Sequence, residues 1–154
     1  MSGNNSVSSA LVPLQQRPLL LPIACIIDVL DYRRPEETDA DISWFLGNTH
    51  WRSQNIPVIS FERLNQRQFA EFSATNRIMI IRRTTEECSI PYYGVVIQGM
   101  PQTQTITEKD IIDSSEETGP AEKMQILFKE VPVILPDLGF IEEKLSEVLA
   151  PAVS

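Results

Sequence analysis

Short hydrophobic runs, separated by polar segments rich in turn-forming residues, recur along most of this chain. Their β-branched residues and limited length predict β-strands rather than helices. A turn at residues 15–18, in which Pro18 sets one backbone dihedral angle, separates the first two runs. The runs occupy residues 10–14, 19–30, 56–61, 77–83, 92–100 and 126–135. The pattern therefore predicts an all-β fold built from many short strands.

Two segments have helical features. Residues 138–149 have sustained helical spacing. The apolar face of this segment comprises Leu138, Ile141, Leu145 and Leu149, whereas Glu142, Glu143 and Lys144 lie mostly outside that face. Within residues 41–47, Asp41 is suited to cap the start of a short helix, and Gly47 is suited to end it with a positive φ angle. We therefore expect one short internal helix and one C-terminal helix.

Two of the expected strands resemble each other. Residues 56–61 read IPVISF and residues 131–136 read VPVILP, so each has Pro-Val-Ile after a β-branched residue. Because proline cannot donate a hydrogen bond to a sheet, Pro57 and Pro132 are expected at strand starts or at sheet edges. The repetition indicates two small barrel-like β subdomains, each containing an equivalent strand.

Composition limits the class of protein. A chain of 154 residues fits one ordinary domain, and its net charge of −8 argues against a protein that binds nucleic-acid phosphates. Residues 1–9 are small and polar, which predicts a short disordered tail rather than a signal peptide. No apolar run approaches the roughly 20 residues of a membrane-spanning helix. We therefore expect a cytoplasmic protein.

The sequence offers little to catalysis. His50 is the only histidine, and no G-x-S-x-G motif marks a serine nucleophile. The Glu-Glu pairs at 36–37, 86–87, 116–117 and 142–143 lie in polar or surface settings, so we expect them to be solvated. Glycine-rich phosphate-binding motifs are absent from the sequence. These observations predict a protein that is not an enzyme and needs no cofactor.

The two cysteines, Cys25 and Cys88, have no second cysteine or histidine at metal-ligand spacing. One histidine and two distant cysteines cannot supply a structural zinc site. We expect two buried free thiols and no metal.

The order of the motifs resembles that of a known family. Residues 44–61 read WFLGNTHWRSQNIPVISF, residues 94–100 read GVVIQGM, residues 106–111 read ITEKDI and residues 131–145 read VPVILPDLGFIEEKL. Together these segments resemble the CheW-like domain of bacterial chemosensory adaptors, over about residues 10–149. The stretch that begins at Trp51 most resembles adaptors of the pilus-linked, twitching-motility systems. Ser53 and Ser60 replace a common Gly and Asp of the family, and Gln98 replaces another Asp, departures that concern partner choice more than fold.

The resemblance implies a fold and a function. The fold would be two five-stranded SH3-like barrels over residues 10–150, with a short helix and a C-terminal helix. The function would be that of a non-enzymatic adaptor in cytoplasmic arrays. Its partners would be the regulatory domain of a CheA-type histidine kinase, which has the same fold and binds barrel end to barrel end, and the cytoplasmic tip of a chemoreceptor.

The resemblance also assigns roles to particular residues. Receptor contact would involve Ile26 as an apolar contact, Asp28 as an acidic partner and Arg52 as a charged anchor. Gly47 and Trp51 would shape the loop that presents Arg52, and exposed edges at Ile56 and Val58 are candidates for kinase contact. Two other interpretations stay open, in which Ile26 is plain core and Arg52 braces the loop through an internal salt bridge.

Two alternative functions also stay open. One is a binding module of the same fold that has lost one partner, an idea that rests on Ser53 and Gln98. The other is an unrelated small β enzyme that uses a pair of carboxylates.

Overall fold

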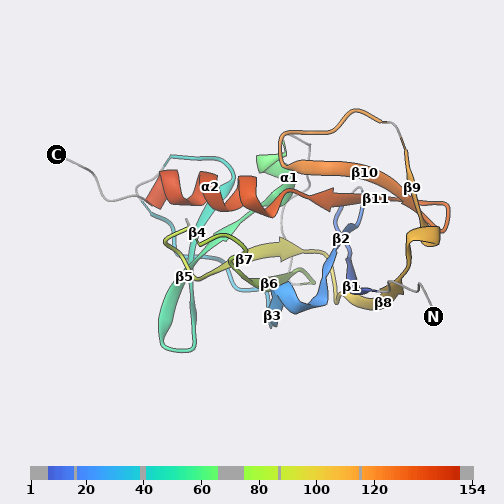
Figure 1. Ribbon diagram of the computed structural model, residues 1–154. Helices are drawn as coiled ribbons and strands as arrows, with labels where there is room; N and C mark the ends of the chain where they lie inside the picture. Colours follow the sequence, from blue (N-terminus) through green and yellow to red (C-terminus); the bar gives the residue numbers. More distant parts are fainter. Residues whose placement is uncertain are drawn as a thin grey trace.

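The computed structural model describes residues 7–15, 17–38, 41–65, 75–86, 88–114 and 116–149, and its strands form two sheets (Figure 1). The five-stranded sheet contains β3 (Ile26–Asp31), β4 (Phe45–Trp51), β5 (Gln54–Ile59), β6 (Arg77–Arg82) and β7 (Tyr92–Ile97). The six-stranded sheet contains β1 (Val7–Val12), β2 (Leu19–Pro22), β8 (Gln102–Ile106), β9 (Ile111–Asp113), β10 (Glu122–Phe128) and β11 (Val131–Pro136). The α-helices are α1 (Phe61–Leu64) and α2 (Leu138–Leu149), and the 3-10 helices are η1 (Ile23–Cys25) and η2 (Glu108–Asp110). The predicted all-β class is confirmed, although one of the two sheets has six strands where five were expected.

The strands of the five-stranded sheet are inserted in the sequence between strands of the six-stranded sheet. The five-stranded sheet has the order β3-β6-β7-β5-β4, and the six-stranded sheet has the order β8-β1-β2-β11-β10-β9. The N-terminal hairpin of β1 and β2 therefore pairs with strands from the C-terminal third of the chain, while β3 to β7 form the other sheet. The expected strand at 19–30 is divided between the two sheets, because β2 ends at Pro22 and β3 begins at Ile26 after η1.

Consecutive apolar residues in these strands face two different cores. Ile78 and Ile80 of β6 belong to a cluster with Trp51, which we call the first-barrel core, whereas Met79 and Ile81 belong to a central core. Likewise Leu20 of β2 faces a third cluster, the second-barrel core, while its neighbours Leu19 and Leu21 face the central core. Because successive side chains of a strand alternate between faces, strands that are buried on both sides read as continuous hydrophobic runs.

The five-stranded sheet closes into a barrel, which we call the first barrel. Its edge strands are β3 and β4, and the segment after β3 pairs with β4 through an isolated bridge between Glu36 and Asn48. The backbone N–H of each of these two residues donates to the carbonyl oxygen of the other, over N–O distances of 2.8 and 2.9 Å. A side-chain hydrogen bond from Trp51 of β4 to Asp28 of β3 also crosses this seam.

The prediction that Gly47 ends a helix capped by Asp41 is wrong. Residues 45–51 form β4, and buried and more exposed positions alternate along it with the period of a strand. Gly47 has a φ angle of 125° within this strand, and a Cβ atom there would overlap the carbonyl oxygen of Glu36. Glycine is required because the seam brings a second backbone against it.

The six-stranded sheet closes through the chain itself and forms the second barrel. Its edge strands β8 and β9 are consecutive in the sequence and are joined by η2. Thr107 and Asp110 form a capping box around this short helix: the Thr107 backbone N–H and hydroxyl donate to the Asp110 carboxylate over 3.0 and 3.1 Å. Ile106, Ile126 and Phe128 are buried inside this barrel.

The two Pro-Val-Ile strands occupy equivalent positions, as their sequences predict. Pro132 is the second residue of β11, near the expected strand start, whereas Pro57 is the fourth residue of β5, which is not an edge strand. In β5 a parallel pairing with β7 joins Val58 to Gly94 and Ile59 to Val95, directly after Pro57. In β11 a parallel pairing with β2 joins Ile134 to Leu19, two residues after Pro132. Each proline therefore precedes the point where its strand gains a parallel neighbour, which is where a missing N–H is tolerated.

The expected tail overlaps the first strand. β1 begins at Val7, and Ser9 is buried. Residues 7–9 are therefore part of the sheet, whereas residues 1–6 lie outside the described part of the chain.

Helix α2 joins the two barrels. Asp137 caps its start, since the carboxylate accepts a hydrogen bond from the Phe140 N–H over 3.0 Å. Ile141 and Leu145 are buried in the central core, with Leu138 and Leu149 packed beside them, as the spacing predicts. The helix follows the last strand of the second barrel but packs over the first (Figure 1).

The expectation that Glu142 is solvated is wrong. Its side chain is fully buried and accepts hydrogen bonds from the backbone N–H and hydroxyl groups of Thr84 and Thr85 and from the Tyr93 hydroxyl, over 2.8–3.0 Å. Burial, and next the charge of Glu142, raise the pKa of Tyr93 well above its usual value, so Tyr93 stays a donor. The remaining members of the Glu-Glu pairs that the structure describes are all exposed: Glu36, Glu37, Glu86, Glu116, Glu117 and Glu143. Glu87 lies outside the described residues.

We predict that Glu142→Gln lowers the free energy of unfolding by about 2–4 kcal/mol, because an amide N–H₂ group would face donors that the carboxylate now accepts. Urea denaturation of the variant and the wild type measures this difference. Glu143→Gln, an exposed position on the same helix, serves as the control and should change stability by less than about 0.5 kcal/mol. Equal stabilities of the two variants would contradict the role of Glu142.

Candidate partner-binding site

The β4–β5 hairpin ends in a two-residue turn made by Arg52 and Ser53. Their φ angles are 47° and 63°, and Trp51 pairs with Gln54 at the base of the turn. Two successive positive φ angles are typical of the type I′ turn that suits a twisted hairpin. The turn projects from the molecule at the lower left of Figure 1, so Arg52 is exposed at its tip.

Trp51 anchors this turn to the first barrel. Its side chain is 5% exposed and packs in the first-barrel core, with its ring edge-to-face against Tyr92 at a centroid distance of 5.1 Å. The indole Nε1–H donates to Asp28 Oδ2 over 3.0 Å, which gives the buried polar edge of the ring a partner. This is the packing position expected for a residue that holds the hairpin in place.

Asp28 has a partner on each carboxylate oxygen. Oδ2 accepts from Trp51, and Oδ1 accepts from the backbone N–H of Val29 over 2.9 Å. The side chain is half-buried on β3. An ionised carboxylate can accept about four hydrogen bonds, so Asp28 retains acceptor capacity for a bound donor.

Arg52 stacks on the tryptophan that its hairpin buries. The guanidinium carbon lies 4.5 Å from the centroid of the Trp51 ring, which is a cation–π contact. Within the described part of the chain Arg52 forms no ion pair, so the structure does not show the bracing salt bridge that was an open interpretation. Asp28, Trp51 and Arg52 therefore form one cluster, in which the arginine is oriented by stacking.

Ile26 is separate from this cluster. It begins β3, pairs with Ile81 of β6 and packs, partly buried, against the central core. Its neighbour Ile27 faces the Trp51 side of the sheet instead. The structure thus brings Asp28 and Arg52 together and places Ile26 on the opposite face of the same strand.

The expectation that Ile56 and Val58 are exposed is wrong. They are 2% and 0% exposed, and both belong to the first-barrel core. Their side chains point into the first-barrel core, while Ile59 on the other face of β5 packs in the central core. Neither side chain can contact a partner in this fold.

Groups that could support catalysis do not gather at the hairpin. His50 is exposed and pairs across the strands with Asn55. Among the described residues, no group of three or more His, Cys, Asp or Glu side chains could hold a metal ion. Cys25 and Cys88 are free thiols, and burial raises the pKa of the half-buried Cys25.

The link between Asp28 and Trp51 has no signal in the sequence. The two residues are 23 positions apart, and no sequence motif links them. The partner of a buried tryptophan N–H is decided by barrel closure, which brings the two edge strands together.

Comparisons with known proteins identify the family and support the fold. The family model of the CheW-like domain matches residues 9–141. Among solved structures, the chain is similar to the scaffolding protein TtCheW from Thermoanaerobacter tengcongensis, with a TM-score of 0.70 and 15% sequence identity, over 84% of this chain and 88% of that chain. At this identity the likeness shows the fold alone. A search of curated proteins found no match.

We predict that Ser53→Gly raises the free energy of unfolding by about 1 kcal/mol, because serine at a positive φ angle carries steric strain that glycine lacks. Thermal or urea denaturation measures the change. Ser89→Gly is the matched control, since Ser89 is also exposed but has no positive φ angle, and this change should be neutral or destabilising. A stabilisation of the same size in both variants would contradict strain at Ser53.

Proposed function

Because the chain belongs to the CheW-like domain family, we propose that it is a non-enzymatic adaptor that couples chemoreceptors to a CheA-type histidine kinase. The observation that carries the proposal is the projecting turn, in which Arg52 is presented on a buried tryptophan. An adaptor needs shaped surfaces rather than reactive groups, and the described residues fit that need. Family membership favours this function over a carboxylate-dependent enzyme.

Receptor contact is proposed at the Asp28–Trp51–Arg52 cluster. The free edge of the guanidinium can make two parallel hydrogen bonds to a carboxylate, and Asp28 can accept from a cationic side chain. A helical receptor tip that carries both charges would bind in one register. Ile26 packs against the central core on the opposite face of β3, so this proposed contact does not depend on it.

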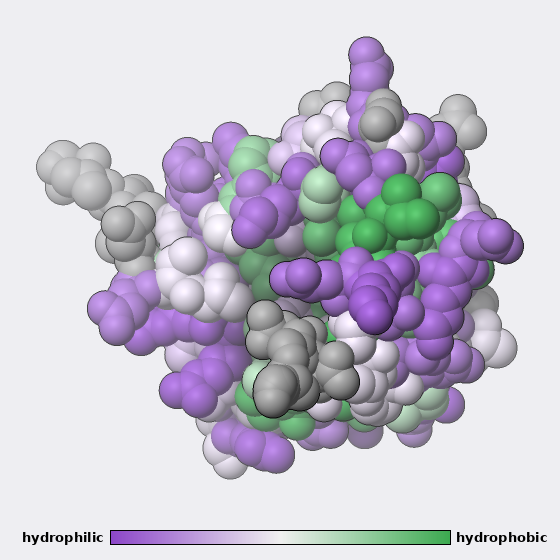
Figure 2. Space-filling model, turned by 45° about the vertical axis from the view of Figure 1, so that its right-hand side comes forward, coloured by the Kyte–Doolittle hydropathy of each residue, from purple (hydrophilic) through white to green (hydrophobic). Residues whose placement is uncertain are grey.

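Kinase contact is proposed at the end of the second barrel instead of at β5. An apolar groove there is lined by Val7, Leu20, Ile106, Ile111 and Leu135. Val7, Ile112 and Val131 of the same sheet are 52%, 62% and 48% exposed. Figure 2, in which this side of the molecule comes forward, shows hydrophobic side chains gathered in a patch bordered by hydrophilic ones. The proposed occupant is the kinase regulatory domain, because a domain of the same fold presents a matching barrel end.

The cellular setting is also part of the proposal. Among the described residues the longest helix is α2, with 12 residues, and no helix has the length and hydrophobicity to cross a bilayer. We assign the protein to the cytoplasm, where membrane-embedded receptors would recruit it into arrays. The W-R-S-Q-N-I-P-V-I-S-F stretch supports the pilus-linked subgroup.

The replacement of the family glycine by Ser53 is one reason to suspect that the protein has lost a partner, and the shape of the turn weakens that reason. Ser53 keeps the two-residue turn in the left-handed conformation that the family glycine would adopt, so this departure does not remove the presentation of Arg52. Both partners therefore stay in the proposal. Purified receptor fragment and kinase regulatory domain should each bind the protein, and binding to one alone would contradict the adaptor.

We predict that Arg52→Glu weakens receptor-fragment binding at least about tenfold, because it reverses the charge at the proposed anchor. Isothermal titration calorimetry with each partner measures the effect, and kinase binding and the melting temperature should change little. Arg33→Glu, an exposed arginine in the loop after β3, makes the same charge change away from the turn and is the control. Equal loss of both partners would indicate a structural role for Arg52.

We predict the opposite selectivity for Val7→Glu. A charge at the rim of the apolar groove should weaken kinase binding at least about tenfold and leave receptor binding unchanged, because burying an unpaired carboxylate is unfavourable. The same titrations measure both affinities. Unchanged kinase binding would move the proposed contact away from this groove.

A further inference from the structure

A cavity of about 420 Å³ lies between the two barrels, away from the Arg52 turn. Its lining comes from α1, from the loop between β1 and β2, and from β10 and β11 with the segment before them. In Figure 1 these helices and strands lie in the upper part of the molecule, whereas β3 and the β4–β5 turn lie in the lower part. Leu14, Phe61 and Ile134 supply apolar walls to this inter-barrel cavity.

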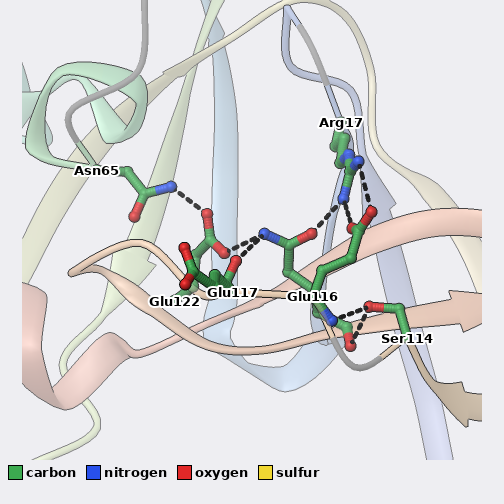
Figure 3. A network of polar contacts seen from close by, with 7 residues as sticks. Arg17, Asn65, Ser114, Glu116, Glu117 and Glu122 are labelled. Atoms are coloured by element: carbon green, nitrogen blue, oxygen red, sulfur yellow. Dashed lines mark hydrogen bonds and ion pairs between the residues drawn. The ribbon is translucent and has the colours of Figure 1, made fainter.

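A polar network forms one side of the cavity (Figure 3). Arg17 donates to the carboxylate of Glu116 and to the side-chain oxygen of Gln125. The Gln125 amide in turn donates to Glu122 Oε1 over 2.7 Å, and Asn65 donates to the other oxygen of Glu122. The positive charge of Arg17 is therefore committed to Glu116, and that hydrogen bond raises the pKa of Arg17.

Glu62 lines the same cavity but has fewer and weaker partners. Glu62 is 5% exposed, and its Oε1 is buried with no hydrogen-bond partner, whereas Oε2 receives a long bond of 3.4 Å from the Gln15 N–H. The backbone N–H of Glu62 itself also interacts with the carboxylate. Burial is the main cause that raises the pKa of Glu62. A buried carboxylate oxygen without a partner is costly, so the group favours either a proton or a bound cation.

The charges around Glu62 favour a cation. The other ionisable groups that line the cavity are Arg17, Glu116 and Glu117, and Glu122 lies behind the network. Acidic groups outnumber the single arginine, and that arginine points at Glu116. A metal ion does not fit, because the described residues contain no group of three carboxylate, histidine or cysteine ligands.

We propose that the inter-barrel cavity binds a primary alkylammonium group, with its N–H donors on the Glu62 carboxylate and its methylene stem along Leu14, Phe61 and Ile134. A compact ammonium can bind through a single carboxylate oxygen, whereas a guanidinium needs two in a plane. The apolar walls match the way a lysine stem packs behind its charge. The group would come from a lysine side chain of a partner protein or from a free diamine.

The first test uses the whole chain and two monocations. In ¹H–¹⁵N spectra, n-butylammonium should shift the amides of Gln15, Glu62 and Asn65 in a saturable way, whereas tetramethylammonium, which has no N–H donor, should not. Glu62→Gln should weaken butylammonium binding about tenfold, since a charge-assisted hydrogen bond is lost. Glu108→Gln, an exposed position on η2, is the control and should leave binding unchanged. Equal shifts with both cations, or unchanged affinity in Glu62→Gln, would overturn the proposal.

A second pair of probes distinguishes the sources. Nα-acetyl-lysine N-methylamide carries one ammonium beside a capped backbone, and 1,5-diaminopentane carries two free ammonium groups. Tighter binding of the capped lysine supports a partner protein, and tighter binding of the diamine supports a free metabolite. Failure of both probes would overturn the site.

Stability separates a binding role from a structural one. Because the pKa of Glu62 is raised in the folded state, ionised Glu62 destabilises the fold. This destabilisation is absent at a pH below the pKa of Glu62 in the unfolded chain, and it is complete at a pH above its pKa in the folded protein. Glu62→Gln should therefore unfold at higher urea than the wild type at neutral pH, and ammonium binding should weaken as the pH falls through the raised pKa. A less stable Glu62→Gln variant, or binding that strengthens on acidification, would overturn the proposal.

Discussion

The closure of the first barrel depends on one seam, where the segment after β3 meets β4. The backbone bridge between Glu36 and Asn48 needs a neighbour without a side chain, and Gly47 supplies it. The hydrogen bond from Trp51 to Asp28 ties the same two edge strands further along. Because this bond also buries the indole, it positions the ring on which Arg52 stacks. The element that closes the barrel is thus the element that presents the proposed anchor.

The central core makes the two barrels one folding unit. Residues from both sheets and from α2 pack in it, and Glu142 connects this helix to the loop between β6 and β7 and to Tyr93. Since β1 and β2 belong to the second barrel while β3 to β7 form the first, no single cut of the chain separates the barrels. Surfaces on the two barrels are consequently held at a fixed distance, which suits a protein that connects two partners.

Local patterns in the sequence predict much of this fold. The hydrophobic runs, the two Pro-Val-Ile strands and the apolar face of α2 depend on neighbours within a few residues, and they appear as expected. The role of Gly47 cannot be predicted locally, because its constraint comes from Glu36 across the seam. Ile56 and Val58 are buried because the closed first barrel surrounds them, which no local pattern reveals. Glu142 and Glu62 resemble surface glutamates in sequence, since nothing local reveals that a carboxylate is buried.

Closure has a consequence for how this protein can assemble. An open sheet edge offers unpaired backbone groups to which another strand can add. Here the edges of the first barrel are bridged at the seam, and the edge strands β8 and β9 of the second barrel are only five and three residues long. Association through added strands is therefore disfavoured. Contacts with other proteins must instead be made by side chains at barrel ends and turns. Contacts of this kind can be specific, reversible and individually weak, unlike the irreversible growth of a fibre by strand addition.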